Sequence, residues 1–356
     1  MTPPLMRAAV YKGRRTVEVE SVPTPAIGPG ELLVRVESCG ICHTDLKKIE
    51  YDLLAPPRIY GHETAGVVAA CGSGVRGYAP GDRVIAFHHI PCVKCFYCER
   101  KLYAQCAVYQ KVGVTAGYEP AGGGFAQYVR VMDWIVARGV EKIPDGLPFE
   151  TASFVEPVNT CLKGFVQLGV DGGDTIIVLG QGPIGLLFTM LAMRRGIRVF
   201  ATDTLAARRT LAERLGAERG LNPANDDIAA VLKAATGGRG ADAAVIAASA
   251  PGIVGDAVRA TRAGARILLF SQTSDRERVE VSGADICKAE RVLFGSYSAS
   301  VDLQRESADL VFSGALSVEQ LISHRLPLND IREGFRLALH PTPESLKIIV
   351  QPQRWS

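Results

Sequence analysis

The sequence predicts an α/β protein with two domains, one compact and β-rich and one built on a doubly wound parallel sheet. The chain has 356 residues, and at roughly 150 residues per domain this length predicts two domains. Short apolar runs separated by Gly and Pro fill the first third, and from about residue 150 strand-like runs alternate with helical stretches. Hydrophobic residues make up 47% and charged residues 22%, which is typical of a globular protein.

The first third contains β-like runs at residues 31–36, 64–70 and 83–87. Turn signals separate them, for example Gly-Pro-Gly at 28–30 and Pro-Gly-Asp at 80–82. This spacing of strands and turns favours a compact β-rich domain.

The second part changes character. Residues 175–179, 198–202, 243–247 and 266–270 are short apolar runs, a helical stretch ends near Arg195, and another covers 206–215. Strands alternating with helices predict a parallel sheet covered by helices. Helical patterning returns after about residue 298, before a last strand at 346–350. We expect domains at 1–155, completed by 298–356, and at 156–297.

Several classes of protein are disfavoured. The apolar run 176–193 is long enough to suggest a membrane span, but Gly180, Gly182, Pro183 and Gly185 interrupt it, which favours a strand, a turn and a helix. The net charge of +3 gives no electrostatic case for nucleic acid or membrane partners. The N-terminus lacks the apolar core of a secretory signal, so we expect a cytoplasmic protein with a small-molecule partner.

Four of the nine cysteines, Cys92, Cys95, Cys98 and Cys106, lie close together. Without a secretory signal such a cluster favours metal ligands over disulfides, and four thiolates form a closed, structural zinc shell. Bacterial iron–sulfur runs share the first three spacings, but their fourth cysteine comes sooner and precedes proline. Here Ala107 follows Cys106. A set of unrelated buried thiols is the third alternative.

A glycine turn lies between the strand at 175–179 and an apolar helix, with the sequence Gly180-Gln181-Gly182-Pro183-Ile184-Gly185. In this context it matches a dinucleotide fingerprint, although an ordinary glycine turn is the alternative. Asp203 ends the next strand, where its carboxylate suits a ribose 2′-hydroxyl and favours NAD over NADP. Arg208, a further candidate for a cofactor contact, and Arg209 weaken this preference.

Two short segments contain candidate catalytic residues: Gly-Ile-Cys-His-Thr-Asp at 40–45 and Gly-His-Glu at 61–63. A thiolate, an imidazole and carboxylates can bind zinc and leave one position for a substrate oxygen. By themselves these residues are only suggestive. A single histidine is often an ordinary polar residue, and Cys39 or Cys42 could simply be buried.

The chain resembles the zinc-containing medium-chain alcohol dehydrogenases, in particular the sorbitol (polyol) and threonine dehydrogenase branch. The segments at 40–45 and 61–63, the four cysteines, the Glu-Pro pair at 156–157 and the glycine turn occur in the family's order over nearly the whole length. The resemblance implies a GroES-like catalytic domain and a Rossmann domain.

The resemblance also implies a ligand set for a second, catalytic zinc. Cys42 and His62 match the family's ligands, and Glu63 matches an adjacent glutamate that binds the metal in some polyol-type members. Glu156 stands where simple alcohol dehydrogenases have another cysteine. Whether Glu63, Glu156 or water completes the shell is open at this stage. Asp45 is similar to the carboxylate that orients the ligands.

Further roles follow from the same resemblance. Thr44 matches the hydroxyl that relays the alcohol proton, and His43 either passes it to solvent or contacts the cofactor phosphates. Thr160 matches a residue near the nicotinamide, and Lys347 a basic residue that reaches the pyrophosphate. His88 matches a pocket-lining position, with a surface-loop histidine as the alternative.

These residues predict an enzyme with two Zn²⁺ per chain that transfers a hydride between a secondary alcohol, polyol-like or cyclitol-like, and NAD. Alternatives are a threonine-type amino-alcohol dehydrogenase, an aminocyclitol dehydrogenase, an aldehyde reductase and an inactive nucleotide-sensing relative. The family resemblance further implies a homodimer or homotetramer.

Overall fold

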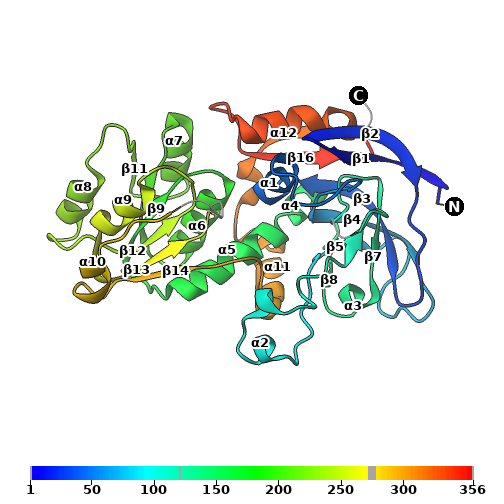
Figure 1. The fold of residues 1–356 in the computed structure, drawn as a ribbon, viewed down its shortest axis with the longest axis horizontal. Coiled ribbons are helices and arrows are strands. Elements are labelled where there is room, and N and C mark those ends of the chain that lie inside the picture. The colour runs from blue at the N-terminus through cyan, green and yellow to red at the C-terminus, as the bar shows by residue number, and fades with distance from the viewer. Residues whose placement is uncertain (1, 120–121, 272–277, 355–356) are drawn as a thin grey trace. The chain divides into compact units, whose positions relative to one another are not determined.

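The computed structural model describes residues 2–119, 122–271 and 278–354, and its internal contacts divide the chain into two units. One unit combines Met1–Asn159 with Ser300–Ser356, and the other is Thr160–Ala299. The expected domain boundaries fall after residues 155 and 297, and the two units divide after residues 159 and 299. Helix α5 (Val155–Leu168) begins in the first unit and ends in the second (Figure 1).

The first unit is mainly antiparallel. Strands β1 (Leu5–Gly13) and β2 (Thr16–Pro23) form a hairpin. An eight-stranded sheet has the order β15-β16-β3-β4-β5-β8, and β7 joins it by pairing with β3 and β6. Its strands are β3 (Leu32–Gly40), β4 (Glu63–Cys71), β5 (Arg83–Ala86), β6 (Val114–Thr115), β7 (Tyr128–Val131), β8 (Val140–Lys142), β15 (Ile322–Pro327) and β16 (Lys347–Gln351).

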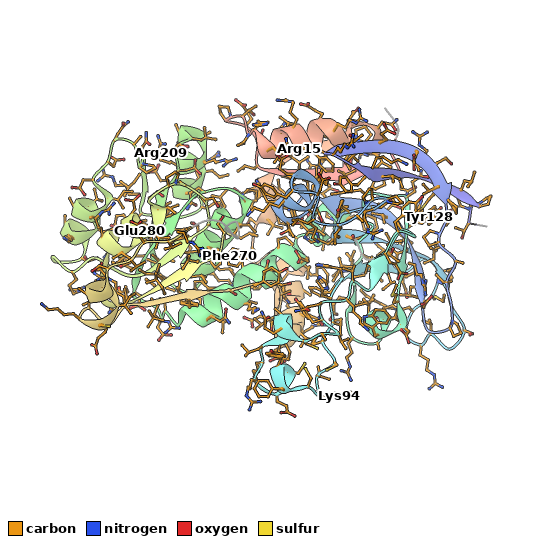
Figure 2. All side chains as sticks on the ribbon, in the orientation of Figure 1. Arg15, Lys94, Tyr128, Arg209, Phe270 and Glu280 are labelled. Atoms are coloured by element: carbon orange, nitrogen blue, oxygen red, sulfur yellow. The ribbon has the colours of Figure 1, made fainter. Side chains whose placement is uncertain are left out.

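Short helices connect these strands. They are α1 (His43–Glu50), α2 (Phe96–Glu99), α3 (Asp133–Val136), α4 (Phe149–Ala152), α11 (Gln304–Phe312) and α12 (Ile331–Leu339). Helix α2 lies in a loop that stands out from the unit, with the exposed Lys94 at its outer end (Figure 2). The tail from residue 300 supplies β15 and β16 to the sheet, so the first unit is complete only when the chain returns to it.

The second unit is a six-stranded parallel sheet in the order β11-β10-β9-β12-β13-β14. Its strands are β9 (Thr175–Leu179), β10 (Arg198–Thr202), β11 (Arg219–Leu221), β12 (Ala241–Ile246), β13 (Thr261–Leu269) and β14 (Val292–Gly295). The first strand of the unit, β9, lies in the middle of the sheet. Strands β10 and β11 follow on one side of it, and β12, β13 and β14 follow on the other, as in a doubly wound dinucleotide-binding sheet. The predicted α/β fold class is therefore confirmed.

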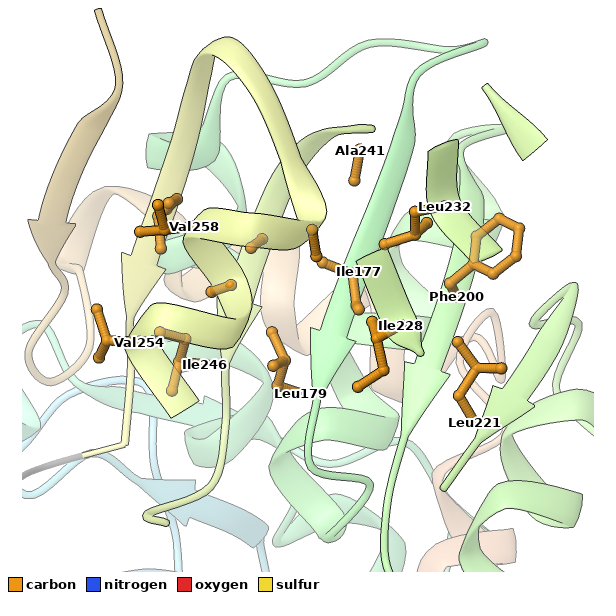
Figure 3. Packing of buried hydrophobic residues seen from close by; sticks show 14 residues of the cluster. Ile177, Leu179, Phe200, Leu221, Ile228, Leu232, Ala241, Ile246, Val254 and Val258 are labelled. Carbon is orange, nitrogen blue, oxygen red and sulfur yellow. The ribbon is translucent and has the colours of Figure 1, made fainter. Parts of the chain in front are cut away.

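Helices cover both faces of this sheet. They are α6 (Pro183–Arg194), α7 (Ala206–Arg214), α8 (Ile228–Ala235) and α9 (Ile253–Ala260), whereas the short α10 (Gly283–Cys287) has no buried residue. All five residues of β9 are buried, which explains why it reads as an uninterrupted apolar run. Ile177 and Leu179 face α8 and α9, where they pack with Leu232 and Val258 (Figure 3).

The apolar run 176–193 is divided between β9 and α6, with the glycine turn between them. Among the described residues, none of the helices combines the length and apolar character that crossing a membrane requires.

Candidate active site

The segments with Cys42 and His62 lie side by side because their strands pair. Strand β3 ends at Gly40 and β4 begins at Glu63, and the antiparallel register places these two residues opposite each other. Cys42 follows as the residue that precedes α1, and its backbone is extended. The candidate ligand atoms of Cys42, His62 and Glu63 lie within 4.8 Å of one another. This combination of thiolate, imidazole and carboxylate fits the ligand chemistry of zinc.

Asp45 holds the ring of His62. Its Oδ1 lies 3.1 Å from His62 Nδ1, and both side chains are buried. Burial would lower the pKa of His62, but the charges of Asp45 and Cys42 outweigh it and raise this pKa well above its ordinary value. With Nδ1 engaged, Nε2 is the nitrogen left for a metal, as in carboxylate–histidine–zinc arrangements.

Glu63 forms a buried ion pair with Lys347, which begins β16. The Lys347 ammonium donates to Glu63 Oε1 at 2.6 Å and to the Ile41 carbonyl at 3.2 Å. Burial would lower the pKa of Lys347, but Glu63 and Cys42 outweigh this effect and raise it. A Cβ atom at Gly40 would overlap the Glu63 carboxylate, so the glycine before Ile41 makes room for the pair.

A second group of candidate ligands contains His62, His88 and Glu156, whose ligand atoms also lie within 4.8 Å of one another. Glu156 stands in the first turn of α5, and burial raises its pKa to about 7. His88 follows β5, and burial lowers its pKa well below the ordinary value, which favours the neutral imidazole. Its ring centroid lies 4.7 Å from that of His62.

The four clustered cysteines converge around one point in the loop that carries α2. The sulfur–sulfur distances are 3.5 Å for Cys95–Cys98, 3.6 Å for Cys92–Cys106 and 3.9 Å for Cys92–Cys98. A tetrahedral shell with Zn–S bonds of about 2.3 Å places its sulfurs about 3.8 Å apart. The spacing of the thiols therefore fits a single four-coordinate zinc ion.

The surroundings of Cys106 favour its thiolate. Burial would raise its pKa, but backbone amides, that of Cys92 first, outweigh burial and lower the pKa to about 6. The packing of Cys98 and Cys106 with Tyr103 and Tyr109 forms a small core of its own. A bound ion would tie this satellite core together, as expected of a structural site.

The glycine turn has the geometry that its sequence predicts. Gly180 has φ +94°, in the left-handed region, and Gly182 precedes α6, with Pro183 in its first turn. A Cβ atom at Gly185 would overlap the Gly180 carbonyl oxygen, whereas one at Gly182 would meet its nearest neighbour at 3.8 Å. Gly185 thus permits close packing of the turn, and Gly182 leaves space beside the helix N-terminus.

Asp203 follows β10 and accepts two backbone hydrogen bonds. The Gln181 amide donates to Oδ2 at 2.8 Å, and the Leu205 amide donates to Oδ1 at 2.9 Å. Arg208 Nη1 lies 3.8 Å from Oδ2, and Arg209 instead donates to the Asp203 carbonyl at 2.7 Å. The carboxylate is thus fixed beside the glycine turn, with one guanidinium next to it.

The structure gives the positions of the remaining predicted residues, and their roles stay predictions. His43 is exposed and Thr44 half-buried in the first turn of α1, and Thr160 is half-buried in the part of α5 that belongs to the second unit. The sequence offered no signal for the pairing of Lys347 with Glu63, because 284 positions separate them.

Comparison with known proteins places the chain in a family. The model for the alcohol dehydrogenase GroES-like domain matches residues 28–145, and the zinc-binding dehydrogenase model matches 183–313. L-Threonine 3-dehydrogenase of Pyrococcus furiosus is 31% identical over 94% of both chains. The chain belongs to the zinc-containing medium-chain alcohol dehydrogenase family. It is therefore an oxidoreductase of the alcohol dehydrogenase type.

Other members of this family match this chain over nearly the whole length of both chains. Sorbitol dehydrogenase of Bacillus subtilis is 28% identical over 99% of both chains, and erythritol/L-threitol dehydrogenase of Mycolicibacterium smegmatis is 29% identical over 98% of both. A solved zinc-binding dehydrogenase of Sinorhizobium meliloti, bound to NADP, has a TM-score of 0.88 and 30% identity, with 98% of this chain and 100% of that chain covered. The relatives thus share a reaction type while differing in the alcohols they are named for.

Proposed function

We propose that this dehydrogenase uses a catalytic zinc ion to transfer a hydride between a secondary alcohol, polyol-like or cyclitol-like, and NAD. The observation that carries the proposal is that His62 belongs to two groups of candidate ligands in the first unit, one with Cys42 and Glu63 and one with His88 and Glu156. A ligand set of one thiolate, one imidazole and one carboxylate has the mixed softness that suits an open zinc site.

Glu156 is our choice for the carboxylate ligand. Glu63 is already paired with the Lys347 ammonium inside the protein, which competes with a metal for its oxygens. Glu156 has a raised pKa of about 7 because it is buried, and a cation beside it would stabilise its charged form. Lys347 then acts first to position Glu63, and its contact with a cofactor pyrophosphate stays a prediction.

Bound zinc would supply Lewis-acid chemistry that lets an alcohol lose its proton near neutral pH. Asp45 would keep Nε2 of His62 directed at the ion by holding Nδ1. The Thr44 hydroxyl would relay the alcohol proton by giving its own proton onward as it receives one, and His43 is exposed, as a group that passes a proton to solvent must be.

The second unit would bind the dinucleotide. The glycine turn and the start of α6 would bind the pyrophosphate through backbone amides. Asp203 would accept hydrogen bonds from the adenosine ribose and repel a 2′-phosphate, which favours NAD. Arg208 beside it is the cation that a 2′-phosphate would use, and Thr160 would lie near the nicotinamide.

The quartet of cysteines would hold a second, structural zinc, so that each chain contains two ions. We also propose that the protein is cytoplasmic. From the resemblance to the family, we propose that it forms a homodimer or a homotetramer.

The test is a substrate panel on the purified protein with its zinc content measured. Polyols, cyclitols, amino alcohols and simple alcohols would be offered with NAD and NADP, and the ketones with the reduced cofactors. We expect reduction of NAD with polyhydroxylated secondary alcohols. Two zinc ions per chain without turnover of any alcohol or ketone would contradict the proposal.

An amino alcohol is the second candidate substrate. The 31% identity with the threonine dehydrogenase of Pyrococcus furiosus favours it. The same panel separates the two, because an amino-alcohol enzyme would turn over threonine analogues and reject the polyol lacking the amino group. Discrimination of this kind is strong when a pocket is built to bind one polar group.

A further inference from the structure

His88 is held in a stack of four rings that starts at His62. Its centroid lies 4.7 Å from the His62 ring and 4.0 Å from the His89 ring, and the His89 ring lies 5.1 Å from that of Tyr109. His89 Nδ1 lies 3.2 Å from the Lys111 carbonyl. His88 differs, because its Nδ1 is enclosed and has no hydrogen-bond partner among the described residues. A buried polar nitrogen without a partner in the protein is available to a ligand, an ion or water.

Two groups of candidate metal ligands share His62. The first is Cys42, His62 and Glu63, and the second is His62, His88 and Glu156. In each group the ligand atoms lie within 4.8 Å of one another. Zinc has no geometric preference from its d electrons and accepts nitrogen, oxygen and sulfur, so the ligand atoms of either group suit it.

We propose that His88 is a protein ligand of the catalytic zinc, in an arrangement with His62 and Glu156 that exchanges with one containing Cys42. This inference rests on the proposed function, since it assigns a further ligand to the ion proposed there. In this arrangement the His88 imidazole takes the place of the Cys42 thiolate, and the fourth position stays free for a substrate oxygen. His88 therefore retains the ion when Cys42 does not bind it.

The test removes Cys42, so that metal binding at this site depends on the other ligands. Zinc is kept in the cysteine quartet. Co²⁺ is then titrated into the proposed catalytic site, called the second site below, while its d–d absorption is recorded. In Cys42→Ala we expect Co²⁺ to bind without a sulfur-to-cobalt charge-transfer band. Adding His88→Phe, which keeps a ring in the stack, should weaken Co²⁺ binding at least tenfold.

The matched control is His89→Phe in the same Cys42→Ala background. His89 belongs to the same stack but to neither ligand group, so its loss should change the Co²⁺ affinity less than twofold. Equal affinities of the two histidine variants would overturn the proposal. Failure of Cys42→Ala to bind Co²⁺ at the second site at all would overturn it too.

Folding and the proposed function are checked separately. Circular dichroism and one retained zinc per chain show that each variant keeps its fold and its quartet. If the unaltered protein holds a second metal and oxidises alcohols, while His88→Phe and His89→Phe behave alike, only the role of His88 fails. If the unaltered protein binds no second metal, the proposed function itself fails.

Discussion

At the residue scale, the contact between Asp45 and His62 decides how the candidate zinc ligand faces its ion. Asp45→Asn replaces the charged carboxylate by a neutral amide, so the His62 imidazole is less well oriented and less basic. We expect metal affinity at the second site to fall about 10–100-fold, with a similar loss of activity. Chelator competition measures the affinity, and zinc in the quartet should be unchanged.

The control for this variant is Asp145→Asn, which alters an exposed carboxylate away from the ligands. It should bind zinc as the unaltered protein does. Equal metal affinity in Asp45→Asn and Asp145→Asn would show that Asp45 does not position His62.

The buried ion pair of Lys347 and Glu63 leads to a second prediction about individual residues. Both side chains are buried, so Lys347→Met leaves a charged carboxylate without its cation. Breaking such a pair by removing one partner costs about 3–5 kcal/mol, and urea unfolding measures the loss. The exposed pair Arg198–Glu218 provides the comparison, since Arg198→Met should cost no more than about 1 kcal/mol. Similar losses from the two variants would contradict the distinct role of the buried pair.

At the scale of elements, two glycines in the turn between β9 and α6 should have different roles, one in cofactor binding and one in packing. Gly182→Ala places a methyl group no closer than 3.8 Å to its nearest neighbour, an ordinary contact, at a backbone angle that alanine accepts, φ −68°. We expect nearly unchanged stability but weaker NAD binding, because the methyl group stands where the pyrophosphate would approach. Gly185→Ala should instead destabilise the second unit, because the methyl group would overlap the Gly180 carbonyl oxygen.

Denaturant unfolding and calorimetric titration with NAD distinguish the two glycines. Unchanged NAD affinity in a stably folded Gly182→Ala would contradict the assignment of the turn to the pyrophosphate.

The loop of the four cysteines is the second element with a testable role. Cys95→Ala opens the proposed zinc shell, and structural zinc contributes directly to folding free energy, by about 10–16 kcal/mol in isolated small sites. We expect loss of one zinc per chain and a clear fall in melting temperature. Cys287→Ala, at an exposed cysteine in α10, should change neither. A Cys95→Ala protein with full zinc content would refute the shell.

At the scale of the whole molecule, cofactor binding should appear as added stability. A ligand present at 100 times its Kd stabilises the protein that binds it by about 2.7 kcal/mol. We expect NAD to raise the melting temperature more than NADP at the same concentration, because the proposed contact of Asp203 with the adenosine ribose would repel a 2′-phosphate. An equal or greater shift with NADP would show that Arg208 outweighs this carboxylate.

Many elements could be predicted from local sequence. The strands at 175–179 and 198–202 have the bounds of β9 and β10, because both read as uninterrupted apolar runs. The run at 243–247 was placed slightly late, since β12 begins at Ala241. The short edge strand β11 (Arg219–Leu221) was missed, because three residues with an exposed arginine show no strand pattern. Local periodicity thus predicts central strands better than edge strands.

The sequence by itself determined the family, the α/β fold class and the candidate ligands, because those depend on residue types at short, characteristic spacings. Cys92, Cys95 and Cys98 illustrate this, since any chain that brings such near neighbours together can enclose one ion. Only the tertiary structure decided that Glu63 is paired with Lys347 and that the ring of His88 lies against that of His62. These contacts join residues distant in sequence through strand pairing and burial, which spacing along the chain does not record.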